Sequence, residues 1–124
     1  MQVDMKAKYV DGFLLVVPKK KVADYVALAK KAGKIWKAHG ALSYCECVAD
    51  DHPRGPSLPF PKRAKCKPSE TVVFAWVGFK TKAHRDKVNA AVMVDPRMQK
   101  LADQPMPFDM KKMSYAGFAV AVSL

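Results

Sequence analysis

The sequence predicts an α+β domain in which a four-stranded antiparallel sheet carries two helices on one face. Two observations predict this fold. Four segments alternate their side chains as β-strands do, and two segments between them have the features of amphipathic helices. In addition, the chain has 124 residues, of which 50% are hydrophobic. That length supports one core, so we treat residues 1–124 as a single domain.

The first half of the chain is predicted to be strand, helix, strand. Residues 9–17 alternate as a strand, which Pro18 ends. Residues 19–39 form the first helix, because their apolar side chains recur at intervals of three and four. Gly40 then takes the left-handed conformation that commonly ends a helix. Residues 41–49 form the second strand.

The second half begins with a long connection. Residues 50–68 contain five prolines and no periodic pattern, which indicates an irregular loop. Residues 70–80 are rich in valine and aromatic side chains and form the third strand. Thr81 is a suitable N-cap for the second helix, which ends near Val94.

The chain ends with a short helical turn and loop at residues 96–107 and a last strand at residues 110–122. The order is therefore strand, helix, strand, strand, helix, strand. With right-handed crossovers, this order gives the ferredoxin-like βαββαβ plait, in which both helices cover the same face of the sheet.

Composition excludes several classes of protein. No apolar run approaches the roughly 18 residues that a membrane span needs, so we expect no membrane association. The first residues lack the apolar core and cleavage site of a secretory signal. Three cysteines, an odd number, are typical of a reducing compartment. We therefore expect a cytoplasmic protein.

The net charge of +11 has two interpretations. Lysine and arginine total 22, but only four of these are arginine, the residue suited to forked recognition of phosphate and bases. The favoured interpretation is a well-solvated surface. The alternative is an RNA-binding module that uses the lysine-rich helix 19–39 and the basic loop 54–67.

The strands carry apolar side chains on both faces, and we sorted them by size. The small and aliphatic set is assigned to the helix-covered face: Val10, Leu14, Val16, Cys45, Cys47, Ala49, Val73, Ala75, Val77, Ala116, Phe118, Val120 and Val122. The aromatic set, which includes two carboxylates, is assigned to the other face: Tyr9, Asp11, Phe13, Tyr44, Glu46, Val48, Phe74, Trp76, Met113, Tyr115 and Gly117. An apolar face of this size requires a partner. The prediction is a homodimer whose two sheets face each other and close an α+β barrel.

Such a barrel either encloses a pocket for a small, partly aromatic molecule or is filled by its own side chains. In a pocket, Asp11 and Glu46 would be the catalytic proton carriers, because a desolvated carboxyl group has a raised pKa. Tyr44 and Tyr115 would donate hydrogen bonds. The predicted pocket wall consists of Tyr9, Phe13, Phe74 and Trp76.

Other motifs have weaker functional interpretations. His39 is a general base or a residue favoured by the helix dipole. His84 and Arg85 at the start of the second helix form an anion-binding site or an exposed first turn. Cys45 and Cys47 are interpreted as small buried thiols under the first helix, with Cα atoms near 7 Å apart, at or beyond the usual limit for a disulfide. The Asp50-Asp51-His52 triplet suits a turn better than a metal site, so we expect no metal and no cofactor.

Several blocks of sequence resemble one bacterial family. They are YVDGF at 9–13, KAGKIWKAHGAL at 31–42, CVADD at 47–51, TVVFAW at 71–76, AHRDKVN at 83–89, DPRM at 95–98 and MPFDMKKM at 106–113. The family is domain of unknown function 1428. Met110 and Ala116 depart from it where glycines are expected, which indicates a different turn or packing there. The resemblance implies a ferredoxin-like fold of the dimeric α+β barrel superfamily, which includes cofactor-independent monooxygenases, dehydratases and isomerases.

The leading prediction is a homodimer that binds a small, partly aromatic molecule, with proton-transfer or monooxygenase-like chemistry by analogy with the superfamily. The RNA-binding module is the main alternative. A structural or partner-binding dimer without catalysis is the third. The sequence does not decide whether the protein is an enzyme.

Overall fold

The computed structural model describes residues 6–53 and 55–124, so Arg54, the first residue of the predicted basic loop, lies outside the described part. The elements are β1 (Tyr9–Pro18), η1 (Lys19–Lys21), α1 (Val22–Ala38), β2 (Ser43–Val48), α2 (Phe60–Arg63), β3 (Glu70–Phe79), α3 (Lys82–Met93), α4 (Pro96–Ala102), η2 (Met110–Lys112) and β4 (Ser114–Ala119). The predicted order of strands and long helices is confirmed.

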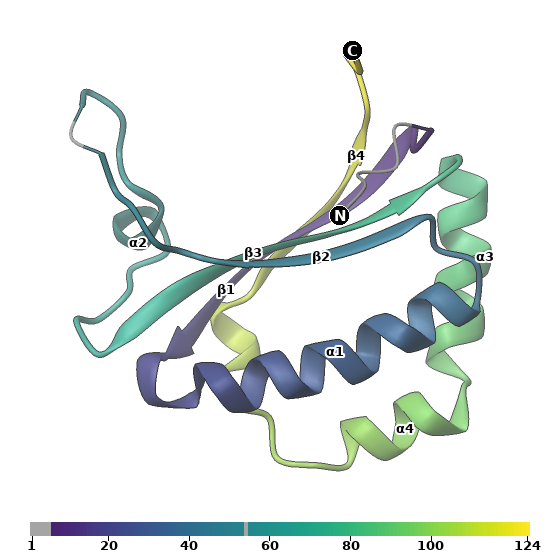
Figure 1. Cartoon of the computed structure of the whole chain (residues 1–124), viewed down its shortest axis with the longest axis horizontal. Coiled ribbons are helices and arrows are strands. Elements are labelled where there is room, and N and C mark those ends of the chain that lie inside the picture. Colours follow the sequence, from purple (N-terminus) through teal and green to yellow (C-terminus); the bar gives the residue numbers. More distant parts are fainter. Residues whose placement is uncertain (1–5, 54) are drawn as a thin grey trace.

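The strands form one antiparallel sheet in the order β2-β3-β1-β4, as expected of a ferredoxin-like plait. Figure 1 shows α1, α3 and α4 together on one side of the curved sheet, with α2 beside the end of the sheet. One face of the sheet is therefore covered by helices. The other, which we call the open face, carries Val10, Gly12, Leu14, Cys45, Cys47, Phe74, Trp76, Ala116 and Phe118.

The ends of several elements differ from the predicted ends, because local hydrogen bonds set them. Residues 19–21 form a 3₁₀ turn before α1. Pro96 occupies the start of α4, and the Asp95 side chain caps that helix by accepting from the Arg97 amide. The Asp109 side chain accepts from the amide of Lys111 and supports a further 3₁₀ turn, so β4 starts later than predicted. The predicted irregular connection contains the short helix α2.

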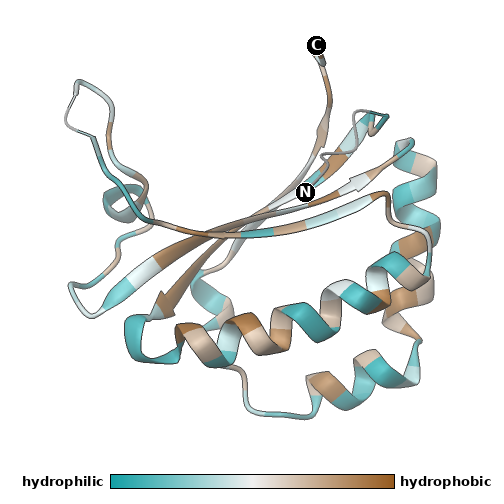
Figure 2. Ribbon diagram, viewed as in Figure 1, coloured by the Kyte–Doolittle hydropathy of each residue, from teal (hydrophilic) through white to brown (hydrophobic). Residues whose placement is uncertain are grey.

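Two groups of buried side chains hold the helices to the sheet. One joins α1, α3 and α4 to the sheet around Phe79, with Ile35, Val77, Val92 and Leu101. The other joins the start of α1 to the middle of the sheet, through Leu15, Val17, Tyr25, Ala29 and Val73. Figure 2 shows hydrophobic residues along the centre of the sheet and at intervals along α1.

The predicted assignment of the faces was wrong for three of the four strands. Cross-strand partners share a face, and the register pairs Asp11 with Val77 and Glu46 with Ala75. Both carboxylates therefore lie on the helix-covered face, together with Phe13, Tyr44 and Tyr115. Only β3 was assigned correctly. The small side chains of β1, β2 and β4 share the open face with Phe74 and Trp76.

Candidate functional site

A cavity of about 510 Å³ lies between the covered face of the sheet and the helices. Its sheet side is formed by Asp11, Phe13, Leu15, Tyr44, Glu46, Ala75, Val77 and Tyr115. Its helix side includes Tyr25, Ala29, Ala32 and Trp36 of α1 and Asn89 of α3. Ligand sites in proteins have this size range, and most are apolar with a few polar groups. The cavity belongs to one chain, whereas the predicted pocket lay between two sheets.

The outer wall of the cavity is rich in methionine. The sequence has seven methionines, and Met1 and Met5 lie outside the described residues. The other five line this cavity: Met93, Met98, Met106, Met110 and Met113. Met93 and Met110 are more than half exposed, which places them at its mouth. Because thioether side chains are flexible and polarizable, this wall can adapt to apolar ligands of different shape.

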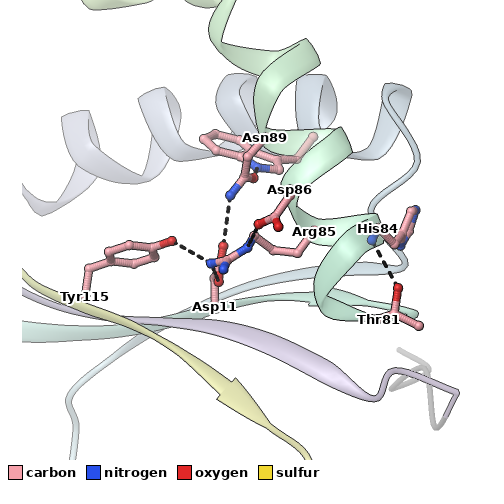
Figure 3. Close-up of polar contacts among 8 residues, drawn as sticks. Asp11, Thr81, His84, Arg85, Asp86, Asn89 and Tyr115 are labelled. Atoms are coloured by element: carbon pink, nitrogen blue, oxygen red, sulfur yellow. Dashed lines mark hydrogen bonds and ion pairs between the residues drawn. The ribbon is translucent and has the colours of Figure 1, made fainter.

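One polar cluster of the cavity surrounds Asp11, which is 1% exposed. The Arg85 guanidinium donates to Asp11 Oδ1 at 2.8 Å, and the Asn89 amide donates to Oδ2 at 3.1 Å (Figure 3). Trp36 Nε1 donates in turn to Asn89 Oδ1 at 3.0 Å. Arg85 also donates to the Tyr115 hydroxyl at 3.0 Å. The cluster joins β1, β4, α1 and α3, so the buried charge is paired and the cavity is fixed at this end.

The other polar cluster surrounds Glu46 on β2. The hydroxyl of Tyr25 donates to Oε1 at 2.7 Å, and the hydroxyl of Tyr44 donates to Oε2 at 2.6 Å. The Tyr44 ring contacts the Trp36 ring at a centroid distance of 6.0 Å. From the strand register, the Cα atoms of Asp11 and Glu46 are about 12 Å apart, so the two clusters occupy different parts of the cavity.

Burial and Glu46 shift the acidity of these tyrosines. Burial is the largest cause that raises the pKa of Tyr25 and of Tyr44 well above the ordinary phenol value, and the Glu46 carboxylate raises both further. Burial also raises the pKa of Tyr115; Asp11 adds to this rise and Arg85 opposes it. The phenols of Tyr25 and Tyr44 therefore stay protonated over the physiological range and act as donors.

The structure brings together five of the predicted site residues. Asp11, Phe13, Tyr44, Glu46 and Tyr115 all line the cavity. Phe74 and Trp76 lie on the open face instead, so their predicted place beside the carboxylates was wrong.

Tyr9 is not part of the cavity lining; its ring lies 5.0 Å from the Arg85 guanidinium carbon. The face of an aromatic ring attracts a cation at this distance. Tyr9 therefore supports Arg85 from the side of β1.

The predicted anion site of His84 and Arg85 is occupied by the protein itself. Arg85 pairs with Asp11 and with the Asp86 carboxylate at 2.8 Å. His84 Nδ1 accepts from the Lys80 amide, while its own amide donates to the Thr81 hydroxyl that caps α3 (Figure 3). The two side chains thus serve different local contacts.

His39 lies outside the cavity and holds α4 to the end of α1. Its Nε2 is 2.7 Å from Asp95 Oδ2, and Arg97 binds the same carboxylate. Hydrogen bonds from Arg97 and then His39 hold the pKa of Asp95 well below its usual range. The contact favours a structural role for His39 over that of a general base.

Sequence reasoning missed Tyr25, Trp36 and Asn89 as site residues. Tyr25 and Trp36 recur at helical spacing with the other apolar side chains of the first helix, a pattern that indicates core packing and not a site. A usable signal was the spacing of Arg85 and Asn89, since residues four apart lie on one side of a helix and can bind the same carboxylate. The five methionines all lie within residues 93–113, but they are spread over α3, α4, η2 and the connections beside them, so no single periodic pattern joins them.

Among the described residues, no helix is long and apolar enough to cross a membrane.

Solved structures similar to this one share its fold at low sequence identity. A dimeric ferredoxin-like protein from an uncultured marine organism has a TM-score of 0.57 and 11% identity, covering 94% of this chain and 98% of its own. A Nitrosomonas europaea protein described as a candidate antibiotic biosynthesis monooxygenase has a TM-score of 0.58 and 11% identity, covering 98% and 96%. A Burkholderia xenovorans NIPSNAP domain protein has a TM-score of 0.56 and 12% identity, covering 91% and 94%.

Sequence comparison gives a nearer relative. The uncharacterized protein YbaA of Escherichia coli K12 is 43% identical over 111 residues, which is 90% of this chain and 94% of YbaA. The family described as "Protein of unknown function (DUF1428)" matches residues 8–110. These two matches confirm the family that the sequence blocks resemble. The chain belongs to the DUF1428 family.

Proposed function

We propose that this protein binds a small, partly aromatic molecule in the cavity between its sheet and helices. The observation that carries the proposal is the cavity itself: about 510 Å³, with a largely apolar lining and two polar clusters. Phe13, Trp36 and the methionines offer the surface on which a ring packs. The two polar clusters offer groups that orient its polar substituents.

Glu46 is the candidate proton acceptor at this site. Each carboxylate oxygen has two lone pairs, and the phenols of Tyr25 and Tyr44 use one on each oxygen. The remaining lone pairs can accept a proton from a bound molecule. Asp11 is less suited to this role, because Arg85 and Asn89 already bind both of its oxygens. The proposed chemistry is proton transfer with Glu46 as the base and Tyr115 as a hydrogen-bonding group.

Superfamily analogy and one neighbour support enzymatic chemistry on this fold. The Nitrosomonas europaea protein described as a candidate antibiotic biosynthesis monooxygenase has a similar fold. At 11% identity this likeness concerns the fold, so the chemistry proposed here depends on the cavity's own residues.

Binding is tested with 1-naphthol as the probe. We expect it to raise the melting temperature of the protein, because a ligand that binds only the folded state stabilises it. Ala32→Phe, which fills the cavity from α1, should abolish this increase. Ala90→Phe is the matched control, since Ala90 is an exposed residue of α3 outside the lining. An equal shift in both variants, or none in the unmodified protein, would contradict binding in the cavity.

Proton transfer is tested with 5-nitrobenzisoxazole. A base removes its ring C–H proton, the N–O bond breaks, and a coloured phenolate nitrile forms. We expect the protein to open the ring faster than acetate at equal concentration, and Glu46→Gln to lower the rate by at least about a hundredfold. Glu70→Gln changes the other glutamate of the sequence, which lies outside the cavity, and should keep the rate. A similar loss of rate in both variants would contradict the role of Glu46 as the base.

We also propose that two copies pair through the open face. Phe74 is 46% exposed and Phe118 is 55% exposed on this face, and a monomer seldom leaves such side chains together in water. A second copy is the partner of matching shape and chemistry, and a neighbour of the same fold is described as dimeric. In this arrangement each subunit keeps its own cavity on the far side of its sheet.

A further inference from the structure

Two thiols lie side by side on the open face, remote from the cavity. Cys45 and Cys47 are two residues apart on β2, so their side chains point the same way. Their sulfur atoms are 3.9 Å apart. β2 is an edge strand of the sheet, and in the single chain Cys47 is exposed and Cys45 is half-buried, so small ions can reach both sulfurs from the edge of the open face. Neither residue lines the cavity, although both lie on the open face through which two copies are proposed to pair.

We propose that Cys45 and Cys47 chelate a thiophilic divalent ion of the zinc and cadmium class. Two thiolates that share a tetrahedral zinc ion at the usual bond length lie about 3.8 Å apart, which matches the spacing seen here. The ion therefore fits between the two sulfurs without movement of the strand. Water or a small external thiol supplies the remaining coordination positions. Among the described residues, no group of three or more His, Cys, Asp and Glu side chains surrounds a common point, so one chain contributes the two sulfurs alone.

The same geometry disfavours a disulfide. A disulfide needs sulfurs about 2.05 Å apart and Cα atoms usually within about 6.8 Å. Residues two apart on a strand are already at that limit, at about 6.7 Å. Closing the bond would require the sulfurs to approach by almost half their present separation and the strand to bend. A metal ion can bridge the two sulfur atoms at their present distance of 3.9 Å.

Binding should depend on pH, because the ion replaces the thiol protons. The affinity should therefore fall steadily as the pH decreases below neutrality.

The test is a titration of the protein, as it elutes from gel filtration, with Cd²⁺ in the presence of a phosphine reductant. We expect a thiolate-to-cadmium absorption band that saturates at one ion per chain, or one per two chains if a second copy completes the coordination. Cys45→Ser and Cys47→Ser should each weaken binding about 10² to 10⁴-fold, since either change removes one arm of the chelate. Far-UV circular dichroism checks the fold, and Ala replaces Ser in any variant that does not fold.

Cys66→Ser is the matched control, because Cys66 is the third free cysteine and lies outside β2. It should keep the band and the affinity. Alkylation with iodoacetamide adds a second readout: bound Cd²⁺ should protect Cys45 and Cys47 while Cys66 reacts. A band that survives in Cys45→Ser, a band lost in Cys66→Ser, or protection of none of the three thiols would overturn the proposal.

Discussion

Asp11 combines deep burial with a full set of partners, and this combination explains why a carboxylate is tolerated under the helices. It is 1% exposed, and the Arg85 side chain that binds it is 14% exposed. A buried ion pair adds little by itself, but the loss of one partner leaves an uncompensated charge in a site of low dielectric. Asp11 is thus a positioning residue that holds Arg85, and through Arg85 the Tyr115 hydroxyl, at the cavity.

Replacing Asp11 by Asn tests this role. We expect Asp11→Asn to lower the free energy of unfolding by about 3 to 5 kcal/mol, because Arg85 loses its buried charged partner and keeps only Asp86, which is exposed. Asp86→Asn removes the other carboxylate on Arg85, which is 62% exposed, and should cost less than about 1 kcal/mol. Urea denaturation measures both. Equal effects of the two variants would show that the pairing of Asp11 does not hold this end of the cavity.

The tyrosines on Glu46 predict a distinctive alkaline titration. The folded chain keeps the phenols of Tyr25 and Tyr44 protonated above the usual phenol pKa of about 10, whereas the unfolded chain releases these protons there. The folded state then binds more protons, so the free energy of unfolding should fall as the pH rises above about 10.

Ultraviolet absorbance of phenolate measures this titration. Tyr25 and Tyr44 should ionise only as the chain unfolds. In Tyr25→Phe the late absorbance step should shrink by the signal of one tyrosine, and the alkaline loss of stability should become shallower. Late ionisation that is unchanged in Tyr25→Phe would contradict the assignment.

Helix α1 packs close to the sheet because Gly33 leaves room for the Tyr44 ring. A Cβ atom at Gly33 would lie 2.6 Å from a ring carbon of Tyr44. That ring cannot move freely, since its hydroxyl binds Glu46 and its face contacts Trp36. The absence of a side chain at Gly33 therefore allows the Tyr44 ring to lie where its hydroxyl binds Glu46.

Gly33→Ala should destabilise the protein by about 1 to 3 kcal/mol from overpacking, even though alanine is the better helix former. Gly55→Ala is the control, because a Cβ there meets nothing within 4 Å. It should change the midpoint of urea unfolding little. The double variant Gly33→Ala/Tyr44→Leu should recover part of the lost stability, and no recovery would argue against the contact with Tyr44.

The order of the elements was predictable from the sequence, but the face of each strand that the helices cover was not. Alternation tells which residues of one strand point the same way, and the breaks at Pro18 and Gly40 mark the ends of elements. Every strand here is apolar on both faces, so alternation alone cannot say which face the helices cover. Sorting by size failed, because the covered face holds small residues on β3 and large or charged ones on β1 and β2.

The candidate site was predictable in its residues more than in its place. Asp11 and Glu46 stood out as carboxylates among apolar neighbours, and both line the cavity. Their partners come from helices that lie far away in the sequence, such as Arg85 at 74 positions from Asp11. Only the packing of α1 and α3 on the sheet reveals them, so the sequence analysis placed the two carboxylates on the face opposite to the one that lines the cavity.

The two faces of the sheet differ in what they bury and what they expose. The covered face forms the core and the cavity within one chain. The open face leaves aromatic side chains in solvent and also carries the Cys45 and Cys47 thiols. Because the cavity does not depend on the open face, the proposed ligand binding and the proposed pairing of two chains can be tested separately by mutation.

Phe118→Glu tests the pairing of two copies. Phe118 is 55% exposed on β4, so the single chain should still fold, but a carboxylate there would be desolvated in a sheet-to-sheet interface. We expect sedimentation to show a dimer for the unmodified protein and a monomer for Phe118→Glu, while 1-naphthol still raises the melting temperature of the variant. Val94→Glu is the control, because Val94 is 71% exposed at the end of α3, away from the open face, and this variant should remain dimeric. A monomeric unmodified protein, or a dimer that survives Phe118→Glu, would mean that the open face is not where two chains meet.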